Sequence, residues 1–329
     1  MLPWWYKTRM STSGRDLEND SSNNVSAPKN EIHPTGRGVL TVAADHPKYA
    51  AQAVSLARSI RLRDRRLPLA VMTNLPAESF HGMYDHVIPW DFRGFPGLLS
   101  KLVVYDGSPF EETLFLDADI LAVRSVNEVF DCFAGHSFAV WGINLVEPIW
   151  FRGIVDHVRS IVPAETYPNF NGGLVYFRRS DTAHQVYKQA KNFIASYDEL
   201  RLRRRRDVPM NEEPLLSLAM AQTGLHAVRR ADLCLMASPW LPRCEETKLD
   251  VLAGFSKVPR PEGFVQPALV HFVGQRKRAF AYSRELRRLA AAYPSGRLSY
   301  LHDAFLRATS YIHWRLTRRS SKSVHRQRR

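Results

Sequence analysis

Long apolar runs, cysteines and acidic residues are all scarce in this 329-residue chain. No stretch approaches the roughly 20 consecutive apolar residues that a membrane-spanning helix needs. The opening residues 1–6 give way at once to polar sequence without the apolar run of a secretory signal, so we expect a cytoplasmic protein. The chain has three cysteines, Cys132, Cys234 and Cys244, without the spacing of a metal site. Because their number is odd, we expect incidental or buried thiols and no disulfide framework.

The shortage of acidic residues leaves a formal net charge of +14, most of it in two segments. Residues 315–329 carry seven basic residues and no acid, and residues 201–206 carry five arginines. Such segments suit anionic lipid, nucleic acid or no specific partner. A non-enzymatic nucleic-acid-binding protein is disfavoured, because no nucleic-acid fold signature is present and no aromatic residues are interleaved with 201–206.

Composition divides the chain into three parts. Residues 1–37 are rich in Ser, Asn, Asp, Lys and Pro, and we expect a disordered arm there. Residues 38–298 carry the pattern of a folded domain. In residues 299–329, apolar and aromatic side chains fall on one helical stripe and basic residues follow. This pattern is typical of a peripheral anchor at the inner face of a membrane, and equally of a helix that packs on the domain before a loose tail.

Short apolar runs alternate with helical patterns in the folded part. Strands are expected at 39–43, 69–72, 86–88, 113–116, 138–142, 174–177 and 268–272. Helices are expected at 47–60, 98–105, 126–133, 182–197, 213–221 and 284–292. Pro47 is favoured in a first helical turn. The alternation predicts an α/β fold with parallel strand pairing.

Two acids, Asp117 and Asp119, directly follow the buried strand at 113–116. Open α/β sheets bind ligands at the carboxyl ends of their strands. At positions i and i+2 of an extended chain both carboxylates can point the same way, hold one divalent ion and leave positions open for phosphate oxygens. A turn or helix cap is the structural alternative. A haloacid-dehalogenase-like phosphohydrolase with Asp117 as nucleophile is another, although several elements precede the acids and no later acidic pair for magnesium stands out.

Four segments, residues 39–45, 114–119, 171–173 and 271–274, occur in an order and spacing that resemble the retaining glycosyltransferases of family eight. This group includes glycogenin and bacterial lipopolysaccharide galactosyl- and glucosyltransferases. The resemblance runs from about Gly38 to about Tyr282. It implies a single-domain A-type fold of the nucleotide-diphospho-sugar transferase superfamily, a mostly parallel mixed sheet flanked by helices, with 38–298 as the catalytic domain. It also implies retaining transfer of a hexose from a nucleotide-diphosphate sugar, generally UDP, to a saccharide or glycolipid acceptor.

The resemblance implies a metal site. Asp117 and Asp119 match the family's metal-binding acids, and His271 matches the third metal ligand. Ala118, between the two acids, matches a position that contacts the nucleotide-sugar donor. An imidazole beside two carboxylates suits Mn²⁺ better than Mg²⁺. Lys277 matches the lysine that binds the diphosphate and helps it leave.

Other matched positions line the donor in the family. Gly274 allows close approach of the backbone to phosphate, and Lys101 resembles a further basic donor contact. Ala43 and Asp45 match the strand end that holds base and ribose, although Asp45 could instead cap the helix at Pro47.

Two matched segments concern the donor sugar. Asn171 and Gly172 match the segment that lines it, with an Asn-Gly turn as the alternative. The family's Asp-Gln pair at the start of a helix corresponds to Glu212-Glu213 here, so Glu213 stands where a glutamine faces the anomeric carbon. A carboxylate there could act as a nucleophile or stabilise an oxocarbenium-like transition state. Both glutamates are also favourable acids at a helix N-terminus.

Overall fold

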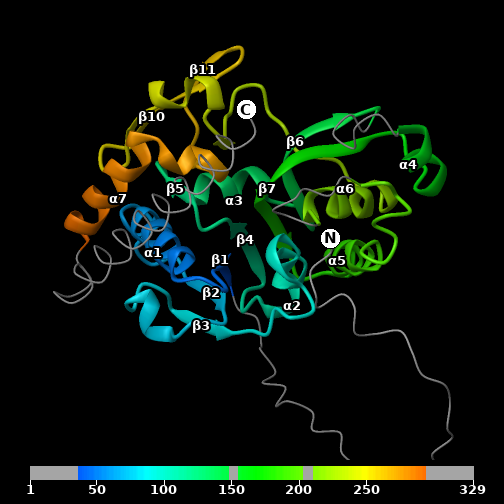
Figure 1. Ribbon diagram of the computed structural model, residues 1–329, viewed down its shortest axis with the longest axis horizontal. Coiled ribbons are helices and arrows are strands. Elements are labelled where there is room, and N and C mark those ends of the chain that lie inside the picture. Colours follow the sequence, from blue (N-terminus) through cyan, green and yellow to red (C-terminus); the bar gives the residue numbers. More distant parts are fainter. Residues whose placement is uncertain (1–35, 148–154, 203–209, 294–329) are drawn as a thin grey trace, which may run out of the picture. The chain divides into compact units, whose positions relative to one another are not determined.

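The computed structural model describes residues 36–147, 155–202 and 210–293 (Figure 1). The predicted arm at 1–37 lies outside these ranges except for its last two residues. The predicted helix and tail at 299–329 and the arginines at 203–206 lie wholly outside them.

A six-stranded mixed sheet forms the centre, in the order β3-β2-β1-β4-β7-β6. Its strands are β1 (Arg37–Val42), β2 (Leu69–Thr73), β3 (His86–Pro89), β4 (Glu112–Leu116), β6 (Phe138–Leu145) and β7 (Tyr167–Arg178). The three pairings among β3, β2, β1 and β4 are parallel, whereas β7 runs antiparallel to both β4 and β6. The predicted α/β fold with a mostly parallel mixed sheet is therefore confirmed.

Helices cover both faces of this sheet (Figure 1). The main ones are α1 (Pro47–Arg61), α3 (Asn127–Phe133), α5 (Asp181–Asn192) and α6 (Glu212–Gln222). Leu114 and Leu116 of β4 pack in one apolar cluster with α1 and α3, and Phe115 packs in a second cluster with α5 and α6. Successive strand residues point to opposite faces, so the continuous apolar run of β4 buries both sides of the sheet.

The start of α1 corrects one interpretation of Asp45. Pro47 lies in the first turn as predicted, but the N-cap is His46, whose Nδ1 accepts the backbone N–H of Lys48 at 3.1 Å. Asp45 instead has a positive φ of 67° and exchanges two 2.8 Å hydrogen bonds with Asn74. The interpretation of Asp45 as a helix cap is wrong, because the chain turns sharply at Asp45 before the helix begins.

Two small sheets accompany the central one. The first has the order β5-β12-β8, formed by β5 (Ile120–Ala122), β12 (Leu269–His271) and β8 (Met236–Ala237). The second is antiparallel and contains β9 (Lys248–Asp250), β10 (Phe255–Arg260) and β11 (Gly263–Val265). The sequence predicted β12, but strands of two or three residues such as β5, β8 and β9 leave no readable periodicity.

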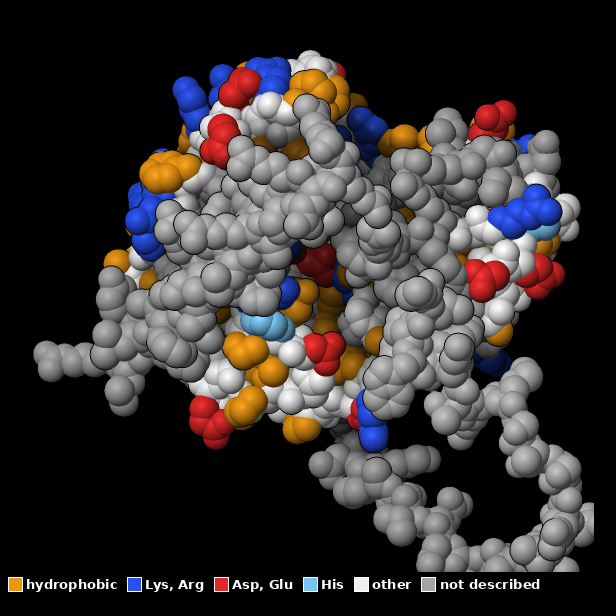
Figure 2. Space-filling model, in the orientation of Figure 1, with side chains coloured by type: hydrophobic (Ala, Val, Ile, Leu, Met, Phe, Trp, Pro, Cys, Tyr) orange, Lys and Arg blue, Asp and Glu red, His pale blue; other side chains and the backbone are white. Residues whose placement is uncertain are grey.

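The remaining helices complete the described chain. They are α2 (Val104–Gly107), α4 (Val155–Ile161), α7 (Phe280–Ala292) and the 3₁₀ helices η2 (Ala77–Phe80), η3 (Gly97–Val103), η5 (Leu241–Glu246) and η6 (Gly274–Arg278). Within the described ranges, no helix is long and apolar enough to cross a membrane. On the face shown in Figure 2, described basic and acidic side chains are interspersed, with no broad area of one sign.

Candidate active site

The acidic turn lies at the carboxyl end of β4, as the sequence predicted. The backbone N–H of Asp117 donates to the carbonyl oxygen of Gly173 in β7 at 3.0 Å, and the carbonyl oxygen of Asp117 accepts the N–H of Ile120 at 3.1 Å. These bonds fix the turn between β4 and β5, with Ala118 buried at its centre. Asp119 is also buried.

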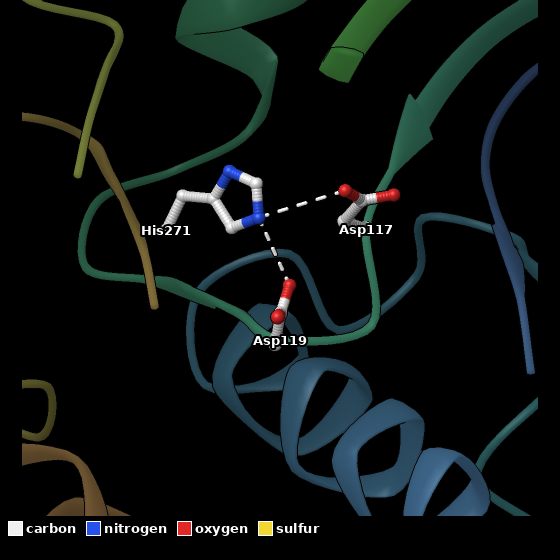
Figure 3. Close-up of side chains that lie close together, drawn as sticks. All are labelled: Asp117, Asp119 and His271. Carbon is white, nitrogen blue, oxygen red and sulfur yellow. Dashed lines mark ion pairs between the residues drawn. The ribbon is translucent and has the colours of Figure 1, made fainter. Parts of the chain in front are cut away.

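His271 lies at the end of β12, the central strand of the first small sheet, and reaches this turn from there. It lies opposite Ile120 in the antiparallel β5–β12 ladder and is only 1% exposed. Its Nε2 lies 2.9 Å from Oδ1 of Asp119 and 3.5 Å from Oδ2 of Asp117 (Figure 3). The fold thus brings together residues that are about 150 positions apart in the sequence.

The three side chains form a group that could hold a metal ion, since their ligand atoms lie within 4.8 Å of one another. His271 Nε2 is buried and has no hydrogen-bond partner among the described residues. An unpartnered buried ring nitrogen that faces two carboxylates is a costly arrangement unless a proton or a cation lies between them. The donor set therefore fits a divalent ion, and its nitrogen ligand favours Mn²⁺ over Mg²⁺.

Lys277 also meets Asp119. A turn at Gly274, whose φ is +61°, leads the chain from β12 into η6. Lys277 lies in η6, and its Nζ forms an ion pair with Oδ2 of Asp119. Burial alone would raise the pKa of Asp119, but the neighbouring His271 and the ammonium group of Lys277 hold that pKa well below its usual range. The carboxylate is therefore ionised and available as a ligand.

Lys101 is buried and contacts acids of the protein, whereas the resemblance implies a contact with the nucleotide-sugar donor. Its Nζ lies 2.8 Å from Oδ2 of Asp117 and 2.8 Å from Oε1 of Glu212, and it donates to the carbonyl oxygen of Gly172 at 3.4 Å. Burial lowers the pKa of Lys101, but the two carboxylates outweigh this effect and raise it above its ordinary value. Lys101 is thus a buried cation between two acids of the protein.

Glu212 and Glu213 open α6 but have different surroundings. Glu212 is 1% exposed, and burial raises its pKa from 4.5 to about 7 despite the nearby Lys101. Glu213 is half-buried, and its Oε1 accepts the N–H of Gly172 at 2.7 Å while its Oε2 accepts from Nδ2 of Asn211 at 3.3 Å. Asn211, which the sequence analysis did not single out as a site residue, is the N-cap of α6.

The segment 171–173 lies inside β7, so the alternative of an Asn-Gly turn is wrong. A side chain at Gly172 would place its Cβ 2.5 Å from Oε1 of Glu212. At Gly173 the Cβ would lie 2.6 Å from Cε1 of His271. Both glycines are therefore needed for close packing of the site against the strand.

The structure joins most of the predicted site residues in one network of contacts: Lys101, Asp117, Asp119, Asn171, Gly172, Glu212, Glu213, His271 and Lys277. Ala43 and Asp45 lie just past β1, which pairs in parallel with β4, and therefore at the same edge of the sheet. Gly173 also belongs to the network, since its carbonyl oxygen accepts the N–H of Asp117 and it packs against His271. No role for it was predicted from the sequence. Its position beside two matched residues was the only available signal.

Comparison with known proteins identifies the fold. No family model and no curated protein sequence matches the chain. Among solved structures, galactosyltransferase LgtC in complex with donor and acceptor sugar analogues has a TM-score of 0.50 at 15% identity over 81% of this chain and 99% of LgtC. An active-site glutamine-to-glutamate mutant of LgtC has a TM-score of 0.52 at 14% identity over the same shares. The fold is that of the A-type glycosyltransferases.

The A-type glycosyltransferase fold places the Asp117–Asp119–His271 group where parallel strands end. Mouse xyloside xylosyltransferase 1 in its apo form is also similar, with a TM-score of 0.45 at 15% identity over 72% of this chain and 98% of that protein.

Proposed function

We propose that the chain is a metal-dependent retaining glycosyltransferase of family eight that transfers a hexose from a nucleotide-diphosphate sugar, a UDP-hexose, to a saccharide or glycolipid acceptor. The convergence of Asp117, Asp119 and His271 at the carboxyl end of β4 carries this proposal. The ion pair of Lys277 with Asp119 adds a cation beside the metal group. The A-type fold supports the assignment, since the predicted metal acids lie at the ligand-binding edge of its sheet.

Each residue of the group has a defined task. Asp117, Asp119 and His271 would hold Mn²⁺ through two carboxylate oxygens and Nε2. When bound, the ion supplies Lewis-acid stabilisation of the negative charge that develops on the departing diphosphate. Lys277 would move its ammonium group from Asp119 to the diphosphate and so stabilise the same charge.

Glu213 would act on the sugar side. LgtC has been solved with an active-site glutamine changed to glutamate, and we propose that Glu213 occupies the equivalent position in this chain. Both oxygens of Glu213 accept hydrogen bonds from the protein, which favours electrostatic stabilisation of the oxocarbenium-like carbon over nucleophilic attack. Glu212 would support this region from its buried pair with Lys101.

The proposed transfer needs only the nucleotide-sugar donor and the acceptor hydroxyl. The bond between the anomeric carbon and the diphosphate oxygen breaks, and the acceptor hydroxyl oxygen forms a new bond to that carbon from the same face. The hydroxyl proton passes to a donor phosphate oxygen. The configuration at the anomeric carbon is thereby retained.

A panel of nucleotide sugars with Mn²⁺ tests the proposal. We expect the wild-type chain to hydrolyse or transfer from one donor, and Asp119→Asn to lower that rate at least 100-fold. Asp91→Asn is the control, because Asp91 is exposed and pairs only with Arg93 in the described structure. If no donor reacts, and Asp119→Asn leaves nucleotide binding unchanged, the proposal fails.

The phosphohydrolase alternative gains no support from the site. It requires a later acidic pair to hold magnesium beside Asp117, whereas the described residues bring a histidine to that position. The basic residues that suggested nucleic-acid binding, at 203–206 and 315–329, lie outside the described residues, so the structure adds nothing for or against that alternative. The division into a catalytic domain at 38–298 and a membrane-associated segment at 299–329, with a location at the inner face of the membrane, stays a prediction.

A further inference from the structure

Asn171 contacts the metal group without being one of its expected ligands. Its Oδ1 lies 2.7 Å from Nδ1 of His271 and accepts the backbone N–H of Gly173 at 3.1 Å. A backbone N–H can only donate, so the atom that faces it is the oxygen and not the nitrogen of the side-chain amide. The chain itself therefore fixes the orientation of Asn171.

This orientation determines where the proton of His271 lies. Because Oδ1 of Asn171 can only accept, Nδ1 of His271 must be the donor in their 2.7 Å hydrogen bond. In a neutral imidazole the lone pair is then on Nε2, which faces Asp119 at 2.9 Å and Asp117 at 3.5 Å. The lone pair of Nε2 and the two carboxylates face one another, so all three groups can bind the same cation.

The packing of β7 holds the ring in this position. The absence of a Cβ at Gly173 leaves space for the ring, since that atom would lie 2.7 Å from Nδ1 of His271. The carbonyl oxygen of Gly173 accepts the N–H of Asp117. Asn171 and Gly173, two residues apart on one strand, thus orient two of the three ligands.

We propose that Asn171 is a positioning residue for the metal centre. It holds His271 in the tautomer that is protonated at Nδ1, with Nε2 directed at the ion. This assigns the side-chain oxygen of Asn171 to the metal centre, although the sequence resemblance matches it to the donor-sugar pocket. The inference rests on the proposed metal-dependent function and deepens it. Partners of this kind fix the orientation and basicity of a metal-bound histidine, and their loss typically weakens metal affinity about 10- to 100-fold.

The test compares Mn²⁺ affinity, measured by electron paramagnetic resonance of free Mn²⁺, among three variants. Asn171→Leu keeps the size but loses the acceptor, so we expect affinity to fall about 10- to 100-fold. Asn171→Asp keeps an accepting oxygen and should stay within about threefold of wild type. Asn169→Leu is the matched control, because Asn169 is another half-buried asparagine of β7, shows no contact with the metal group among the described residues, and should leave affinity unchanged.

The outcomes separate this inference from the proposed function. If wild type binds Mn²⁺ and Asn171→Leu binds it equally well, the role of Asn171 is overturned while the metal site stands. If folded wild type binds no Mn²⁺, the proposed function fails together with the inference. An equal loss in Asn171→Leu and Asn171→Asp would also overturn it, because a general packing defect would explain the result.

A second measurement uses no variant and therefore does not depend on how well Asn171→Leu folds. In the wild-type protein loaded with diamagnetic Cd²⁺, ¹⁵N spectra of His271 should show a proton on Nδ1 and the metal on Nε2. Metal coordination through Nδ1 would overturn the proposal.

Discussion

The backbone N–H of Phe272 donates to the carbonyl oxygen of Asp119 at 3.1 Å. This bond continues the antiparallel ladder in which His271 lies opposite Ile120. Main-chain hydrogen bonds thus bring the backbone of His271, the proposed third ligand, beside the acidic turn. The metal-binding side chains should therefore be replaceable without loss of the fold, which makes their function testable.

Metal removal should lower stability only when the ligands are intact. For wild type in excess Mn²⁺, we expect a chelator to lower the melting temperature by several degrees, because an ion that binds only the native state stabilises it. Asp119→Asn should show no such shift and should retain a cooperative transition. Differential scanning calorimetry measures both. An equal chelator effect on wild type and Asp119→Asn would place the ion elsewhere.

Lys101→Met should be strongly destabilising. The substitution leaves the buried Glu212 and the half-buried Asp117 without the cation that lies 2.8 Å from each. Removal of one partner of a buried ion pair typically costs about 3–5 kcal/mol. The double variant Lys101→Met/Glu212→Gln should recover part of this loss, because it no longer buries an unpaired Glu212 carboxylate. Urea unfolding gives the free energies, and a loss below about 1 kcal/mol in the single variant would contradict a buried pair.

The raised pKa of Glu212 predicts a pH dependence with a definite sign. Burial raises this pKa from 4.5 to about 7, so the folded state binds more protons than the unfolded state between these values. The free energy of unfolding should therefore fall as pH rises from about 5 to 8, by at most about 3 kcal/mol for this group. Glu212→Gln lacks the titrating group, so its unfolding free energy should fall less over this range. If the unfolding free energies of wild type and Glu212→Gln changed equally with pH, the pKa of Glu212 would not be raised in the folded state.

Much of the fold could be predicted from the sequence, because long apolar strands and helical spacing are local signals. The turn at Asp117–Asp119 followed from the apolar run of β4, and the family resemblance assigned His271. The full length of β7 was not predicted, since Asn171 and two glycines have low strand propensity, and the pairing of Tyr167–Phe170 with β6 extends the strand before them.

The contacts of Lys101 could not be predicted for a different reason. Lys101 and Glu212 are far apart in the sequence, and neither has a local pattern that marks it as buried. A lysine in a helical segment ordinarily places its charge in solvent. Only the folded chain shows that this one lies between two carboxylates. The hydrogen bond that His271 donates to Asn171 could not be predicted for the same reason.

Gly173→Ala should disturb the site because the new Cβ would overlap the ring of His271 at 2.6 Å. We expect a destabilisation of about 1–3 kcal/mol from overpacking and a loss of Mn²⁺ affinity of at least tenfold. Gly94→Ala is the matched control, since a Cβ there meets no described atom within 4 Å. Thermal unfolding and Mn²⁺ titration of both variants give the comparison. Unchanged Mn²⁺ affinity in Gly173→Ala would show that the ring can move freely away from β7.

Calorimetric titration of UDP into the wild-type protein, with Mn²⁺ and then with a chelator, tests the central claim most directly. Asp117, Asp119 and His271 would hold the ion, which would offset the negative charge of the diphosphate. The account therefore predicts that UDP binds at least 100-fold more tightly with Mn²⁺ and that Asp119→Asn abolishes this difference. Equal UDP affinity with and without Mn²⁺ would contradict it.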